Sequence, residues 1–164
     1  MGIDRPSDNS GASSTPSEAF EWAAYNRPCL GERVSGDVVI VVPMDMKLLA
    51  VLIDVLGHGA EANGLAMEMA DYVRKNPVAV PSAMIESLHK AFKGSRGAAA
   101  GCAVLDARSH GVVFAGVGNP SFRIFSSSQS TTLPVSDGIV GREIRTPKDH
   151  SAQLLAKDLL IATS

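Results

Sequence analysis

The sequence is poor in the features that mark several classes of protein. Cysteine occurs only at Cys29 and Cys102, which are far apart and lack metal-type spacing, and this favours a reduced, cytoplasmic protein with two unpaired thiols. The 15 lysines and arginines against 17 acidic residues form no basic run, so we expect no nucleic-acid partner. No apolar stretch approaches the roughly 20 residues of a membrane span, and no signal-peptide pattern is present, so we expect no membrane association.

What remains is the composition of one globular domain. The chain has 164 residues, 45% hydrophobic and 20% charged, which is enough for a substantial core. Residues 1–17 are rich in serine, proline and glycine and nearly lack large apolar side chains, which predicts a disordered leader. We therefore expect the folded domain to occupy residues 18–164.

One stretch organises this domain. Six apolar residues in a row, 48–53, end in Asp54, which is followed by the turn Gly57-His58-Gly59. A short apolar run bounded by a charge and by glycines is typical of a buried strand. After Gly59, apolar residues recur with helical spacing and predict a helix over 60–75. Asp54 is therefore expected at the end of a strand, where a ligand can reach it.

A second aspartate should lie beside Asp54. Asp37 begins another apolar run over 37–43, and only a short turn separates this run from the next one. Two strands joined by so few residues form an antiparallel hairpin, in which the start of one strand lies beside the end of the other. Asp37 and Asp54 are thus expected to be close at one edge of the sheet.

The remaining elements indicate an α+β fold with antiparallel sheets. A second helix is expected over 82–93, and the residues between 126 and 132 are expected to form a polar loop. Alternating or apolar patterns predict further strands over 18–27, 97–106, 111–116, 121–125 and 158–163. Strand pairs, then two helices, then more strands do not suit the βαβ units of a parallel sheet.

Paired aspartates allow two interpretations. Neighbouring carboxylates repel each other unless a proton or cation lies between them, and all-oxygen sites suit Mg²⁺ or Mn²⁺. A centre of this kind can activate water for attack on a phosphoryl group. The alternative is that Asp37 and Asp54 only cap turns and the helix after Gly59. Composition and spacing do not separate the two.

Several motifs resemble those of the metal-dependent (type 2C-like, PPM) protein phosphatases. The pattern is most similar to the sporulation stage II E (SpoIIE) branch, and within it to the short RsbX-like stressosome phosphatases. The motifs that carry the resemblance are, in chain order, Gly36-Asp37, Asp54-Val55-Leu56-Gly57-His58-Gly59, Arg96-Gly97-Ala98-Ala99-Ala100-Gly101, Ala115-Gly116-Val117-Gly118-Asn119-Pro120, Gly138-Ile139-Val140-Gly141 and the final run from Asp158.

This resemblance implies a fold and a chemistry. The family fold is a four-layer α-β-β-α sandwich of two antiparallel sheets flanked by helices, with two Mn²⁺ or Mg²⁺ ions at one end. It implies hydrolysis of phosphoserine and phosphothreonine by metal-activated water. Asp37 and Asp54 would be catalytic metal ligands, with Asp54 bridging both ions and the Val55 carbonyl as a further ligand. His58 and Arg96 are candidate substrate contacts; the alternatives are a loop hydrogen bond for His58 and a solvated surface position for Arg96.

The resemblance also implies one departure and a class of partner. In the family the last strand leads into an Asp-Gly pair that supplies another metal ligand, whereas this sequence ends at Ser164. We therefore expect a phosphatase domain without its C-terminal end, and a binding or regulatory module with weak metal binding is the alternative function. The implied partners are phosphorylated bacterial signalling proteins, with stressosome scaffold components as the first candidates.

Overall fold

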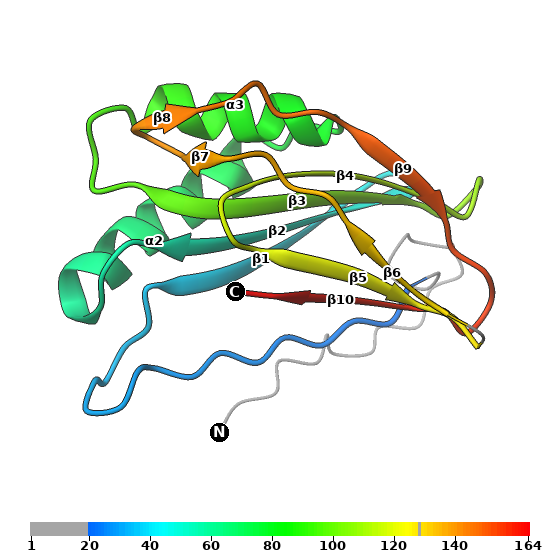
Figure 1. Cartoon of the computed structure of the whole chain (residues 1–164), viewed down its shortest axis with the longest axis horizontal. Helices are drawn as coiled ribbons and strands as arrows, with labels where there is room; N and C mark the ends of the chain where they lie inside the picture. Colours follow the sequence, from blue (N-terminus) through cyan, green and yellow to red (C-terminus); the bar gives the residue numbers. More distant parts are fainter. Residues whose placement is uncertain (1–19, 128) are drawn as a thin grey trace.

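A central sheet of five antiparallel strands runs through the molecule (Figure 1). The computed structural model describes residues 20–127 and 129–164; the expected leader, 1–17, lies outside them, and the predicted domain boundaries stay a prediction. In spatial order the strands of this sheet are β1 (Asp37–Met44), β2 (Lys47–Val55), β3 (Ala98–Asp106), β4 (Gly111–Val117) and β9 (His150–Gln153). The first four correspond to predicted strands, and they carry the candidate site.

Smaller sheets complete the strand structure. The second sheet consists of β10 (Leu159–Thr163), β5 (Ser121–Phe125) and β6 (Ser130–Leu133), in that order and all antiparallel. A two-stranded ribbon, β7 (Gly138–Ile139) with β8 (Glu143–Ile144), lies beside the start of β3, where Val140 bridges to Ala98. The predicted α+β class with antiparallel sheets and flanking helices is confirmed.

Two helices cover one face of the central sheet. These are α2 (Gly59–Lys75) and α3 (Pro81–Ala91), within two residues of the predicted bounds. Figure 1 shows both on the side of the sheet away from β5, β6 and β10. The predicted apolar stripe of α2 is buried against the sheet, through Ala62, Ala66, Met69, Ala70 and Val73. None of the helices in the described part of the chain is long and apolar enough to cross a membrane.

The other face of the central sheet packs on the second sheet. Phe114 of β4 and Phe122 of β5 are fully buried there, with ring centroids 4.6 Å apart. Leu52 of β2 belongs to the same cluster, whereas its neighbours Val51 and Ile53 belong to the core under the helices. Because side chains alternate along a strand, Asp54 shares the face of Leu52 and lies at the end of the layer between the sheets.

The predictions differ from the structure in several places, and the ribbon of β7 and β8 is one of the elements that were not expected. The strand predicted over 18–27 is wrong for the described part of that stretch, because residues 21–27 are exposed and follow no strand pairing. The loop predicted over 126–132 is shorter, since β6 already begins at Ser130. Strand β9 was not expected; its short polar sequence, His-Ser-Ala-Gln, joins the sheet through backbone pairing with β4.

Candidate metal centre

The hairpin of β1 and β2 brings the two aspartates together as predicted. Asp37, the first residue of β1, is the direct antiparallel partner of Asp54, the last residue but one of β2. Opposite residues in such a pair have their Cβ atoms roughly 5 Å apart and their side chains on the same face. Both aspartates are half-buried. The sheet therefore presents two carboxylates side by side at its edge.

The environment of Asp54 disfavours its charged form in the absence of a cation. Burial is the main cause that raises the pKa of Asp54 above its ordinary value, and the charge of Asp37 and a hydrogen bond with it act in the same direction. The side chain of Asn119 opposes these effects by hydrogen bonding to the carboxylate. A divalent cation between the two aspartates would remove the repulsion that the bare pair carries.

The backbone after Asp54 is held in a tight turn. The amide of Val55 donates to the carbonyl of Gly36 at 3.1 Å, and the amide of Leu56 donates to the carbonyl of Gly97 at 3.0 Å. A Cβ on Gly36 would lie 3.2 Å from the Val55 carbonyl oxygen and 3.1 Å from the Cβ of Ala62. Glycine at position 36 therefore leaves room around the carbonyl that the family resemblance assigns to the metal.

His58 lies at the start of α2 and is bonded to a neighbouring loop. Its Nδ1 lies 2.6 Å from Oε1 of Glu32, and its side chain is 73% exposed. The same glutamate approaches Gly59, where a Cβ would meet the carboxylate at 3.2 Å. This loop contact is the alternative that the sequence left open; the predicted role of His58 in substrate binding stays a prediction.

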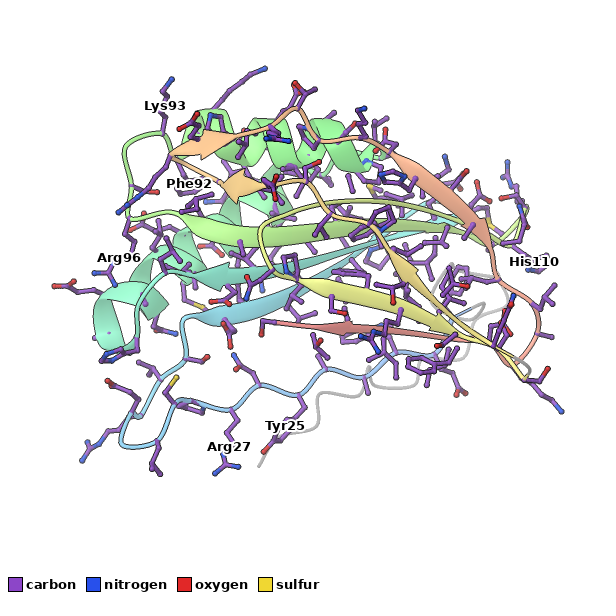
Figure 2. All side chains as sticks on the ribbon, in the orientation of Figure 1. Tyr25, Arg27, Phe92, Lys93, Arg96 and His110 are labelled. Carbon is purple, nitrogen blue, oxygen red and sulfur yellow. The ribbon has the colours of Figure 1, made fainter. Side chains whose placement is uncertain are left out.

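Arg96 lies at the end of the molecule where β2 turns into α2, opposite the end that carries His110 (Figure 2). Its Nη2 donates to Oε2 of Glu61 at 2.7 Å, and its Nη1 donates to the carbonyl of Leu56 at 3.3 Å. The guanidinium thus contacts the turn that follows Asp54 and the first turn of α2. Its predicted contact with substrate is likewise not tested by these bonds.

A cavity beside Asp37 adds residues that the sequence did not single out. It has a volume of ≈ 220 Å³ and is lined by residues 25–27, the start of β1, Leu52 and residues 162–164. Tyr25 and Arg27 project from the segment that runs below the sheets in Figure 2. The side-chain amide of Asn26 donates through Nδ2 to the backbone carbonyl of Asp37 at 2.7 Å. The sequence predicted a strand over 18–27 and gave no sign that residues 25–27 would lie beside Asp37, so only the fold could place them at the site.

The residues present fit a divalent metal ion that keeps several of its waters. Asp37, Asp54 and the Val55 carbonyl are all oxygen donors, the type that Mg²⁺ and Mn²⁺ prefer. Among residues 20–127 and 129–164, no cluster of three or more histidine, cysteine, aspartate or glutamate side chains is placed to hold a metal. The described donors are thus a carboxylate pair with an adjacent carbonyl.

Comparison with solved structures identifies the class. A structure from work on the bacterial stressosome as a modular system controlling secondary messenger signalling aligns with a TM-score of 0.75 and 26% identity, over 84% of this chain and 72% of that one. RsbX in complex with magnesium aligns with a TM-score of 0.69 and 27% identity, over 79% of this chain and 65% of that one. The chain is homologous to PP2C-type serine/threonine phosphatases such as RsbX.

The family follows from the sequence model of stage II sporulation protein E (SpoIIE), which matches residues 44–164. The chain therefore belongs to the SpoIIE family. The PP2C phosphatase domain of SpoIIE from Bacillus subtilis shares the fold, with a TM-score of 0.65 and 24% identity over 77% of this chain and 40% of that one. The chain thus spans less than two thirds of the RsbX and SpoIIE chains that it matches. No curated protein matches it.

Proposed function

We propose that this protein is a metal-dependent protein serine/threonine phosphatase that uses two Mn²⁺ or Mg²⁺ ions to hydrolyse phosphoserine or phosphothreonine. The observation that carries the proposal is the direct pairing of Asp37 with Asp54 in the β1–β2 hairpin. Family membership supports it, as does the similarity to an RsbX structure that contains magnesium. When bound, the ions would supply a water activated at neutral pH and neutralise charge on the phosphoryl group.

The residues of the chain have defined tasks in this proposal. Asp37 and Asp54 would hold the ions, and the Val55 carbonyl would add a neutral oxygen. Asn119 lowers the pKa of Asp54 and so favours the charged carboxylate that a metal ion requires. The buried cluster around Phe114 and Phe122 includes Leu52, which lies on the same face of β2 as Asp54. His58, at the start of α2, is proposed to approach the phosphorylated residue.

The proposed substrates are phosphorylated signalling proteins of bacteria, with stressosome scaffold components as the first candidates. This choice rests on the similarity to RsbX and to the structure from work on the stressosome. The exposed side chains of Tyr25 and Arg27 belong to the residues that line the cavity beside Asp37, and they would be available to a protein substrate. The proposed place of action is the cytoplasm, where Cys29 and Cys102 would remain free thiols, as they are in the structure.

The test is metal-stimulated hydrolysis of p-nitrophenyl phosphate and of a phosphothreonine peptide. We expect Mn²⁺ to stimulate turnover, and we expect Asp54→Ala to reduce it to the level measured in chelator. Asp45→Ala is a matched control, because Asp45 is an exposed aspartate in the turn at the far end of the same hairpin. Equal activity with and without chelator would contradict the proposal.

A second candidate is a binding module that recognises phosphoproteins without hydrolysing them. The observation that favours it is that the described part of the chain offers two carboxylates and no larger metal-binding cluster. Calorimetry would then show binding of the phosphothreonine peptide with no release of phosphate. Turnover that depends on Asp54 would exclude this candidate.

A further inference from the structure

Arg96 connects three segments that meet beside the candidate metal centre. Through Nη1 it bonds the Leu56 carbonyl in the turn after Asp54, and through Nη2 it bonds Glu61 in the first turn of α2. Arg96 itself lies just before β3. The next residue, Gly97, accepts a hydrogen bond at its carbonyl from the backbone amide of Leu56 at 3.0 Å. Residues 96 and 97 therefore hold the backbone of Leu56 at both its amide and its carbonyl.

The turn is shaped to receive the guanidinium. Gly57 has a φ of +96°, and a Cβ at this position would lie 2.8 Å from Nη1 of Arg96. Any other residue at 57 would therefore be strained and would displace the arginine. The α2 N-terminus receives no side-chain hydrogen bond from its cap residue His58, so the bond to Glu61 supplies a tertiary link where a local cap is missing.

We infer that Arg96 is a positioning residue that holds the Val55–Gly57 turn, and with it the metal-binding oxygens of Asp54 and Val55, against the start of α2. The metal in this inference rests on the proposed function. The two hydrogen bonds from Arg96 to Leu56 and Glu61, which we call the brace, do not depend on that proposal. A planar guanidinium is suited to this task, because its fixed donors reach a carbonyl and a carboxylate at the same time. The Arg96 side chain is only 33% exposed, whereas that of Glu61 is 85% exposed.

The brace and a direct substrate contact make opposite predictions for Glu61. If Arg96 acts through the turn, Glu61→Gln weakens the brace and lowers metal affinity in the same direction as Arg96→Gln. If Arg96 instead binds the substrate phosphate, Glu61→Gln frees the guanidinium and lowers KM for the phosphothreonine peptide. Variants of this one pair therefore separate the two roles.

The first measurement is calorimetric titration of Mn²⁺ into the wild type, Arg96→Gln, Arg96→Lys and Glu61→Gln. Residues that orient metal ligands typically contribute about 10–100-fold to metal affinity. We expect a rise of about that size in Kd for Arg96→Gln, a smaller rise for Glu61→Gln, and an intermediate rise for Arg96→Lys. Arg108→Gln is the matched control, because Arg108 pairs with Asp45 at 3.7 Å on an exposed turn; its Kd should equal that of the wild type.

The second measurement is hydrogen exchange without metal, which tests the brace independently of the proposed function. We expect Arg96→Gln to accelerate exchange at the amides of residues 56–59 while β3 and β4 keep their protection. Unchanged exchange there would overturn the inference, and so would an unchanged Kd with a raised peptide KM. If the wild type binds no Mn²⁺, the proposed function fails, and the exchange result alone decides whether the brace exists.

Discussion

Substitution of Gly101 by alanine tests how the two sheets are held together above the site. Gly101 lies in β3, and an added Cβ would overlap Cε2 of Phe122 and lie 3.0 and 3.1 Å from two further ring atoms. The ring cannot move freely, because Phe122 is 1% exposed and packs against the ring of Phe114. Overpacking of a filled core costs roughly 1–3 kcal/mol. For a domain of this size each kcal/mol lowers Tm by about 2–4 °C, so we expect a fall of roughly 2–12 °C.

Thermal and urea denaturation of matched variants would measure this cost. Gly64→Ala is the control, because Gly64 lies within α2 with no atom near its added Cβ, and we expect it to stabilise the protein by about 0.5–1 kcal/mol. Phe122→Leu should recover part of the loss in the Gly101→Ala background, since it removes the overlapping ring atoms. Stability of Gly101→Ala equal to the wild type, or strictly additive effects with Phe122→Leu, would refute the packing argument.

Two further predictions concern stability. Asp149 accepts hydrogen bonds from the amide and the hydroxyl of Ser82 at 2.8 and 2.9 Å, so Asp149→Ala should cost about 1 kcal/mol in urea denaturation, and Ser82→Ala should cost less because the amide bond survives. Equal stability of Asp149→Ala and the wild type would contradict a stabilising role for these two hydrogen bonds. In chelator, the stability contributed by Asp54 should be present at low pH and lost as the pH rises through its pKa, because folding raises that pKa above 3.8. Denaturation across pH 3.5–7 should show this loss in the wild type and not in Asp54→Asn; parallel curves would count against the carboxylate pair.

Elements with strong local patterns were predictable from the sequence. The run before Asp54 and the run after Asp37 are uniformly apolar, and the short turn between them leaves an antiparallel hairpin as the simple solution. Helix α2 was predictable because its buried residues repeat with the period of a helix. These two facts were sufficient to place the candidate metal ligands side by side.

The remaining features depend on partners that are distant in sequence. Strand β9 is polar and becomes a strand only because β4 offers it a free edge. The exposed stretch over residues 21–27 alternates like a strand but has no strand to pair with in the described structure. Arg96 resembled any surface arginine until the fold brought Glu61 and Leu56 beside it, 35 and 40 residues away.

The most direct test of the central claim is anomalous diffraction from crystals soaked in Mn²⁺. If the paired aspartates form the metal centre, the anomalous map should show density in contact with the carboxylates of both Asp37 and Asp54. Crystals of Asp54→Asn, grown and soaked in the same way, should lose that density. Manganese density elsewhere in the wild type, with none beside the Asp37–Asp54 pair, would contradict the account.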